Sequence, residues 1–168
     1  WTMESGTYRA VAEAVVEYLR KVDIRARMIT YDSAVYWDKF DEYLAPDGGE
    51  YPTKKGAFDI YIGGWTGGES AYSTLFPLFI AHSFHNASFY DNPEVNDLLN
   101  SLKAMSDENK RNGIYKELQA KIVDDAPWIF AYHGQLVYGV RPRVKGFHVS
   151  PAEEFNLDGV RVLNPGEG

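Results

Sequence analysis

A glycine-rich run is the part of the sequence that comes nearest to a known chemical motif. Gly63-Gly64-Trp65-Thr66-Gly67-Gly68-Glu69-Ser70 almost fits the phosphate-loop pattern. Glu69, however, stands where that motif has a lysine, and a carboxylate repels the phosphate that a lysine attracts. The glycine spacing of a dinucleotide-binding loop is also missing. We therefore expect no nucleotide cofactor, and we interpret the glycines as residues that let the backbone turn sharply and approach another group closely.

Two histidines, His82 and His85, are spaced three apart, and Glu69 or Asp91 is near enough in sequence to supply a carboxylate. Zinc hydrolases instead place two histidines four apart on a helix, with a catalytic glutamate between them. Three ligands in a defined geometry are not evident in this pattern. We expect no metal site and interpret both histidines as loop residues that make ordinary hydrogen bonds.

The residue types of a catalytic triad are present, but their arrangement is not that of a known hydrolase. Serine, histidine and aspartate all occur, yet the Gly-x-Ser-x-Gly nucleophile elbow does not. Asn86-Ala87-Ser88 fits a glycosylation acceptor, a pattern short enough to arise often by chance. We interpret Asp124 and Asp125 as solvated residues at a helix end. The residues alone therefore predict a ligand-binding or interaction domain with no catalytic residues and no cofactor.

Charge and composition narrow the class of partner. The net charge is −7 with no basic patch, which argues against nucleic acid as a partner. The absence of cysteine excludes disulfides and thiolate metal sites. Tyrosine and tryptophan are abundant, and they suit surfaces that become buried when a ligand binds, although an aromatic core is the alternative. The chain opens in what reads as the tail of a strand, so we expect a fragment whose export signal lies outside it.

The first half of the sequence alternates between helical and strand periodicity. Apolar spacing predicts helices over Tyr8–Leu19 and Ser33–Leu44, and strands over Ile24–Tyr31 and Phe58–Ile62. Residues 46–56 are rich in glycine and proline and predict a loop. This order is typical of a parallel α/β sheet. The glycine run then follows the carboxyl end of a parallel strand, where open α/β sheets bind ligands.

The second half predicts two helices and then strands. Asn92-Pro93 places a capping residue before a proline at the first helical position, ahead of an apolar stripe from Val95 to Leu102. Ser106 is predicted to cap the next helix, which Pro127 ends. Three further strands are predicted over Trp128–Tyr132, Leu136–Val140 and Val144–Val149.

Five phrases, in register along nearly the whole chain, are similar to those of one known family. They are Phe58-Asp59-Ile60-Tyr61-Ile62-Gly63-Gly64-Trp65, Asn86-Ala87-Ser88-Phe89-Tyr90 with Asn92-Pro93-Glu94-Val95, Arg111 to Ala120, Asp125-Ala126-Pro127-Trp128-Ile129, and Val144-Lys145-Gly146-Phe147. The chain resembles the family 5 extracellular solute-binding proteins of ABC importers, which include oligopeptide-, dipeptide- and nickel-binding proteins.

The resemblance implies a fold and a domain organisation. The fold is a lobe of the periplasmic-binding-protein type (type II), with a mostly parallel sheet flanked by helices, in a two-lobed protein that closes over its ligand. Residues 1–140 would form most of the C-terminal ligand-binding lobe. Residues 141–168 would be a tail that returns toward the N-terminal lobe.

The resemblance also implies a site. Trp65 matches the family's cleft tryptophan, and the other expected ligand-binding residues are Glu69, Tyr72, His85, Asn86 and Tyr90. The family's peptide binders often carry an aspartate three residues after the cleft tryptophan, to pair with the peptide's amino group. This chain has Gly68 there, with Glu69 next to it. The departure leaves room for peptides that are held differently, or for oligosaccharides that stack on aromatic rings.

The implied function is that of a binding component and not of an enzyme. It would bind an oligopeptide or similar solute outside the cytoplasm, in the periplasm or as a surface lipoprotein, and deliver it to an ABC permease in the membrane. The alternatives are an oligosaccharide-binding member of the family, a sensory or chaperone-like binder on the same fold, and a hydrolase that uses Glu69 and His85.

Overall fold

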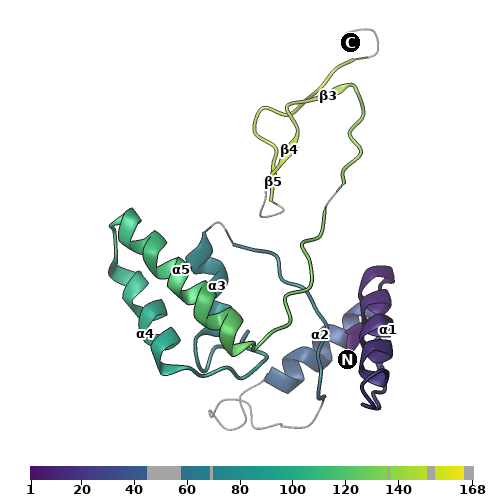
Figure 1. The fold of residues 1–168 in the computed structure, drawn as a ribbon. Helices are drawn as coiled ribbons and strands as arrows, with labels where there is room; N and C mark the ends of the chain where they lie inside the picture. Colours follow the sequence, from purple (N-terminus) through teal and green to yellow (C-terminus); the bar gives the residue numbers. More distant parts are fainter. Residues whose placement is uncertain (45–57, 69, 136, 151–153, 165–168) are drawn as a thin grey trace. The chain divides into compact units, whose positions relative to one another are not determined.

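The computed structural model describes residues 1–44, 58–68, 70–135, 137–150 and 154–164 (Figure 1). The chain divides into two compact units, Trp1–Trp65 and Thr66–Gly168, and each is described in its own frame. No helix within the described ranges is long and apolar enough to cross a membrane.

The first unit is built on a small parallel sheet. It contains β1 (Thr2–Met3), α1 (Gly6–Arg20), β2 (Thr30–Tyr31) and α2 (Ser33–Leu44) in that order. β1 pairs in parallel with β2, with Thr2 opposite Thr30. Thr2 also forms a parallel bridge to Ile62, so β1 lies between the other two segments. Each crossover between neighbouring parallel segments contains a helix, as parallel connections require.

The predicted helices are confirmed, and the predicted strands are shorter than expected. α2 has the predicted bounds, and α1 extends the predicted helix by a residue or two at each end. Of the predicted strand Ile24–Tyr31, only Thr30–Tyr31 pairs, and of Phe58–Ile62 only Ile62 does. Residues 24–27 are exposed on both faces of the segment. The alternating sequence pattern thus corresponds to an extended segment. Because neither face of this segment is buried, nothing fixes it in a sheet.

Aromatic side chains form the core of the first unit. Tyr36, Phe40 and Tyr43 follow one face of α2 and are buried. Their partners come from the segment that ends at the sheet: the Phe40 and Tyr61 rings lie 5.0 Å apart, and those of Tyr43 and Phe58 lie 4.4 Å apart. Aromatic pairs at these separations add to the stabilisation that comes from burial alone. The core thus ties α2 to the segment that leads into the glycine run.

The second unit begins with packed helices. They are α3 (Ala71–Phe79), α4 (Pro93–Ser101), the 3-10 turn η1 (Leu102–Ala104) and α5 (Glu108–Asp125), and α4 contacts both α3 and α5 (Figure 1). Their shared core, called here the helical core, consists of Leu78, Phe79, Val95, Leu99, Leu102, Leu118 and Ile122. The predicted apolar stripe from Val95 to Leu102, together with Leu118 and Ile122 of α5, supplies most of it.

The helix α3 was not predicted from the sequence. It begins with a reciprocal cap, in which the Ser70 side chain accepts from the backbone of Ser73, and the Ser73 side chain accepts from the backbone of Ser70. Pro77 lies inside the helix, where the missing N–H and the ring usually break the helical pattern. Burial of Leu78 and Phe79 in the helical core stabilises the helix despite this proline.

The predicted start of α4 is confirmed, and the predicted cap of α5 is wrong by one residue. The Asn92 side chain accepts from the backbone N–H of Glu94 and Val95, and Pro93 is the first helical residue. α5 is capped by Asp107 and not by Ser106, because the Asp107 carboxylate accepts from the backbone N–H of Lys110 at 3.1 Å. A carboxylate at this end also interacts favourably with the helix dipole. α5 ends before Pro127, as predicted, with Ala126 in the left-handed region.

The C-terminal part contains short antiparallel ladders. β3 (Val144–Lys145) pairs with β6 (Arg161–Val162), and β4 (His148–Val149) pairs with β5 (Phe155–Asn156). The prediction of one strand over Val144–Val149 is wrong, because Gly146 adopts a φ of 76° and separates β3 from β4. A side chain at Gly146 would also meet the carbonyl oxygen of Gly159.

The two strands predicted before this region are not observed. Trp128–Tyr132 and the described residues 137–140 form no paired strand, and Leu136 lies outside the described residues. Trp128 is half-buried against the helical core, but Ile129 and Val137 are 88% and 92% exposed. Their sequence pattern is that of a strand, but no described segment forms a strand ladder with them.

We expect Leu118→Ala to destabilise the protein by about 2–5 kcal/mol, as other large core truncations do. Leu118 is fully buried in the helical core, so its loss leaves a cavity. The control is Val123→Ala on the same helix, where the side chain is 62% exposed and the expected change is within about 0.5 kcal/mol. Denaturant unfolding of both variants measures the difference, and equal effects would contradict the assignment of the core.

Candidate ligand-binding site

The carboxyl edge of the parallel segments gathers three connections in the first unit. β1 leads into α1, β2 leads into α2, and Ile62 leads into Gly63-Gly64-Trp65. Because the three segments run parallel, all of these connections leave from the same edge. The Asp32 carboxylate is used there to cap α2, accepting from the backbone N–H of Ala34 and Val35. This edge is where open α/β sheets bind their ligands.

Trp65 follows this edge directly and is the most accessible of the candidate residues that the structure describes. Its side chain is 42% exposed. An indole ring that keeps part of its face in solvent can stack on, or pack against, a bound molecule. The structure thus places Trp65 where the sequence predicts it, and its contact with a ligand stays a prediction.

The two glycines before Trp65 are required by space. A side chain at Gly63 would lie 2.6 Å from the Tyr61 hydroxyl oxygen, and one at Gly64 would overlap the Tyr8 hydroxyl oxygen. Neither glycine has a positive φ, so backbone freedom is not the reason for them. The sequence predicts a close approach at these glycines, and in the structure tyrosine side chains of the chain itself make it.

The later part of the glycine run explains why position 68 has glycine and not the aspartate that the family's peptide binders often carry there. The Gly68 backbone N–H donates to the Thr74 hydroxyl at 2.9 Å, at the start of α3. A side chain at Gly68 would collide with Ser73. An aspartate in the position that peptide binders use for the amino group would therefore not fit without rearrangement. Glu69, the neighbouring candidate, lies outside the described residues.

Asn86 is a buried structural residue in the loop before α4. Its side chain is 1% exposed. The amide donates to the carbonyls of Ile80 and Tyr90, and its oxygen accepts from the Ser88 hydroxyl and the Tyr90 N–H, at 2.7 to 3.1 Å. These four bonds use the full capacity of the amide. Asn86 therefore shapes the loop, and its burial leaves the glycosylation pattern without an accessible acceptor.

Tyr90 connects the start of α4 with the end of α5. Its hydroxyl donates to the Asp125 carboxylate at 2.5 Å, and the Asn92 amide donates to the same oxygen at 2.7 Å. The bond from Tyr90 and then the bond from Asn92 lower the pKa of Asp125. Burial, and then the same contact with Asp125, raise the pKa of Tyr90. The second and fourth of the family's phrases therefore meet in space through this network.

Tyr72 and His85 are half-buried. Tyr72 lies in the first turn of α3, packs against the helical core and has its ring 5.1 Å from that of Phe76. Burial raises the pKa of its hydroxyl. The His85 ring stands edge-on to Phe84 at 5.2 Å. The part of the chain that the structure describes has no group of three or more histidine, aspartate or glutamate side chains that could hold a metal ion.

The predicted residues fall into two groups. Asn86 and Tyr90 contact each other directly, and Tyr72 and Tyr90 both pack against the helical core, all in the second unit. Trp65 belongs to the first unit. Tyr8, Tyr36 and Tyr61 lie beside the start of the glycine run and are not among the residues predicted from the sequence. They come from three different elements, so no spacing in the sequence links them.

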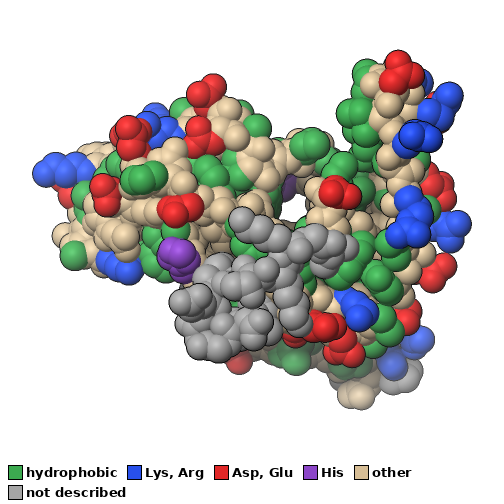
Figure 2. Space-filling view, turned by 90° about the horizontal axis from the view of Figure 1, so that it is seen from below, with side chains coloured by type: hydrophobic (Ala, Val, Ile, Leu, Met, Phe, Trp, Pro, Cys, Tyr) green, Lys and Arg blue, Asp and Glu red, His purple; other side chains and the backbone are tan. Residues whose placement is uncertain are grey.

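One open depression of about 560 Å³ lies beside the Tyr90–Asp125 contact. It is acidic, and Lys121, which is ion-paired with Glu94, is its basic member. Its lining residues are Tyr90, Asp91, Asn92, Pro93, Glu94, Lys121, Asp124 and Asp125. Across the face in Figure 2, lysine and arginine side chains are interspersed with aspartate and glutamate.

The chain has an α/β fold like that of solved peptide-binding proteins. The oligopeptide-binding protein AppA from Bacillus subtilis, in complex with a nonapeptide, matches 97% of the chain with a TM-score of 0.73 and 19% identity. The putative peptide-binding protein AppA from Clostridium difficile matches 96% with a TM-score of 0.66 and 22% identity. The fold class predicted from the sequence is thereby confirmed.

Sequence comparison confirms the family resemblance. The chain is 28% identical over 158 residues to the dipeptide-binding protein of Escherichia coli, a match that covers 92% of the chain and 27% of that protein. It is 37% identical over 106 residues to the glutathione-binding protein GsiB of Pectobacterium atrosepticum, which covers 59% of the chain and 20% of that protein. No protein-family model matches the chain. The chain is thus similar in sequence to dipeptide- and glutathione-binding proteins, and it spans less than a third of the length of these relatives.

We expect Tyr90→Phe to destabilise the protein at neutral pH, by an amount that shrinks in acid. The lowered pKa of Asp125 means that its ionised form adds stability above its unfolded-state pKa, and that this stability is lost as pH falls through the folded-state pKa. Without the Tyr90 hydroxyl, the folded-state pKa returns toward its ordinary value and the variant lacks part of this stability.

The control for this prediction is Tyr115→Phe. The Tyr115 hydroxyl accepts from Arg111, whose charge does not change in this pH range, so its effect is expected to be independent of pH. Thermal unfolding from about pH 7 to about pH 3 compares the two variants with the wild type. A Tyr90→Phe deficit that is constant across this range would contradict the coupling to Asp125.

Proposed function

We propose that the chain is the ligand-binding part of a solute-binding protein that takes up peptides for an ABC importer. The observation that carries the proposal is the match of more than nine-tenths of the chain, in sequence and in fold, to dipeptide- and oligopeptide-binding proteins. The relatives are named as binding proteins and not as enzymes, which supports a binding role without turnover.

The local chemistry supports a ligand held by aromatic surface and backbone groups. Trp65 is partly exposed beside the carboxyl edge of the parallel segments. Gly68, in the place of the aspartate, has no side chain with which to pair an amino group. We infer that recognition of a peptide amino terminus by a carboxylate at this position is absent, and that Trp65 contributes to binding by packing. Tyr72, His85 and Glu69 stay candidates for additional contacts, while Asn86 and Tyr90 support the loop.

The rest of the site belongs, in this proposal, to a second lobe. The relatives are about three times as long as the chain, and the apolar residues Ile129, Val137 and Tyr138 are exposed at 88%, 92% and 42%. We propose that residues 1–140 form most of one lobe, and that residues 141–168 return toward the other. One relative is named as periplasmic, and we propose an extracytoplasmic location and a membrane permease as partner.

The experiment that tests this function is native mass spectrometry of the full-length protein. A co-purifying ligand whose mass and fragments are those of a peptide would support the proposal. Titration calorimetry with a tripeptide library then gives the affinity, and oligosaccharides and heme serve as competing ligand classes. Exclusive binding of an oligosaccharide, or hydrolysis of any bound peptide, would overturn the peptide-binding function.

We expect Trp65→Ala to weaken peptide binding by roughly 1–3 kcal/mol, the scale for the loss of a large buried apolar contact. Because Trp65 is partly exposed before the ligand binds, thermal unfolding without ligand should be nearly unchanged. Calorimetry and melting of the full-length variant measure the two quantities. If the variant instead melts well below the wild type and binds normally, Trp65 is a core residue.

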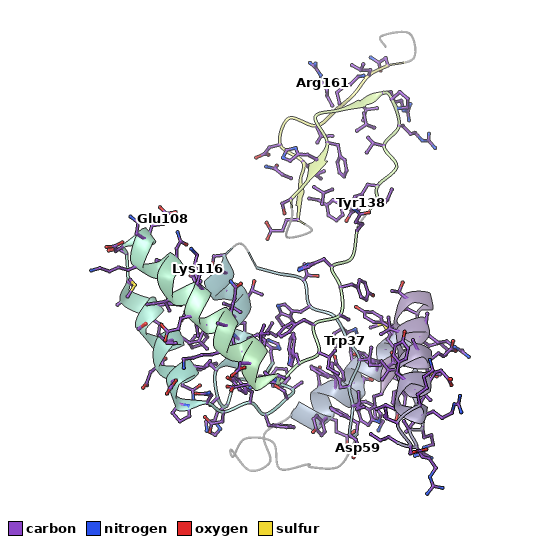
Figure 3. All side chains as sticks on the ribbon, viewed as in Figure 1. Trp37, Asp59, Glu108, Lys116, Tyr138 and Arg161 are labelled. Carbon is purple, nitrogen blue, oxygen red and sulfur yellow. The ribbon has the colours of Figure 1, made fainter. Side chains whose placement is uncertain are left out.

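The matched control is Trp37→Ala. Trp37 is also 42% exposed and belongs to the same unit, where it lies on α2 (Figure 3). It does not follow a strand end, and its ring stands edge-on to those of Tyr36 and Phe40. We expect this variant to lose stability and to keep its affinity for peptide, the reverse of Trp65→Ala.

We also expect the isolated 168-residue chain to fold and to bind peptide much more weakly than the full-length protein, because one lobe supplies only part of the cleft. Circular dichroism checks folding and calorimetry compares the affinities. Equal affinities would place the whole site within these residues.

A further inference from the structure

Three tyrosines from three different elements surround the backbone that leads to Trp65. Tyr8 lies in the first turn of α1, Tyr36 lies in α2, and Tyr61 precedes the residue that pairs with β1. The Tyr36 and Tyr61 rings stack at 5.8 Å, with 23° between their planes. The Tyr36 hydroxyl donates to the carbonyl oxygen of Ile62 at 3.2 Å. Ile62, the last residue before the glycine run, is therefore held in place by a side chain of α2.

Tyr8 limits the same backbone from the side of α1. A side chain at Gly64 would overlap the Tyr8 hydroxyl oxygen, whereas the next Tyr8 atom, the ring carbon Cζ, would lie 3.3 Å away. At Gly63 the situation differs, because a side chain would meet the hydroxyl oxygen of Tyr61 at 2.6 Å and two ring carbons at 2.7 Å. The constraint at Gly64 thus comes mainly from one oxygen atom, and that at Gly63 from a whole ring edge.

The Tyr36 and Tyr61 hydroxyls are uncharged at physiological pH. Burial raises the pKa of Tyr36, and it raises the pKa of Tyr61 to about 12. Electrostatic interaction with Tyr8 contributes to both shifts in the same direction. The contacts of Tyr36 and Tyr61 at the start of the glycine run are therefore those of neutral, closely packed groups.

We propose that Tyr8 is a positioning residue for the ligand site, whose hydroxyl sets the location of Gly64 and thereby the direction in which Trp65 presents its indole ring. The inference rests on the proposed role of Trp65 in binding. It adds that Tyr8, in the first turn of α1 and far from Trp65 in the sequence, controls the site through its close approach to Gly64. A methyl group at Gly64 would displace the glycine run, and removal of the Tyr8 hydroxyl would make room for that methyl group.

A double-mutant cycle in the full-length protein tests this inference. The variants are Gly64→Ala, Tyr8→Phe and the double variant. The first readout is affinity for a tripeptide library by calorimetry. The second is independent of ligand: the fluorine NMR signal of Trp65 in protein labelled with 5-fluorotryptophan, assigned with Trp65→Phe. We expect Gly64→Ala to weaken binding about tenfold or more and to shift this signal. The double variant should recover most of the affinity and most of the wild-type Trp65 signal. Independent structural roles of the two residues would not produce this recovery.

The matched control is the same cycle at the neighbouring glycine. Gly63→Ala should also weaken binding, but Tyr61→Phe should not rescue it, because the ring carbons at 2.7 Å remain. Gly67→Ala, where the nearest atom is the Thr74 hydroxyl oxygen at 3.5 Å, should be tolerated. Thermal melting of each variant identifies any variant that fails to fold. If Gly64→Ala fails to fold, the fluorine signal of Trp65 in the single variant Tyr8→Phe becomes the test. A shift of that signal from its wild-type position supports the inference.

The outcomes separate the two proposals. If Tyr8→Phe fails to rescue a folded Gly64→Ala in either readout, or if the Trp65 signal is the same in all variants, the role of Tyr8 is overturned. If the wild type binds no tripeptide, the proposed function fails, while recovery of the Trp65 signal in the double variant still supports the positioning role of Tyr8.

Discussion

The parallel pairing of Thr2 with both Thr30 and Ile62 is the constraint on which the first unit depends. It brings three chain segments into line and makes their connections leave at one edge. Both helices of this unit then start from that edge, and so does the glycine turn that ends in Trp65. Without this pairing, the candidate site would have no common frame, because the described paired segments are only one or two residues long.

Aromatic side chains stabilise both units, but in different ways. In the first unit they form the core between α2 and the segment that ends at the sheet, so the same rings that stabilise the fold also limit the glycine turn. In the second unit Phe79 packs against Trp128 at 5.0 Å, at the margin of an otherwise aliphatic core. The high aromatic content therefore has a structural cause in the described chain, and Trp65 is distinguished by its place and not by its type.

The sequence predicted what depends on local periodicity and capping. α1, α2 and the start of α4 were predicted because apolar stripes and an asparagine–proline pair specify them locally. Pro77 argues against a helix at α3, and the reciprocal Ser70–Ser73 cap together with burial in the helical core overrides it. Strands were predicted too long, since alternation cannot show whether a partner is present. The role of Trp65 rests on its place after a predicted strand and on the family resemblance, and it stays a prediction. The close approach of Tyr8 to Gly64 joins residues distant in sequence, so it left no local signal.

The hydrogen bonds of Asn86 and the contact of Tyr90 with Asp125 have a consequence for what shared phrases indicate. These residues lie in the phrases on which the family resemblance rests, and their polar atoms bond within the chain. Shared phrases of this kind therefore indicate a shared framework, and they do not specify a ligand.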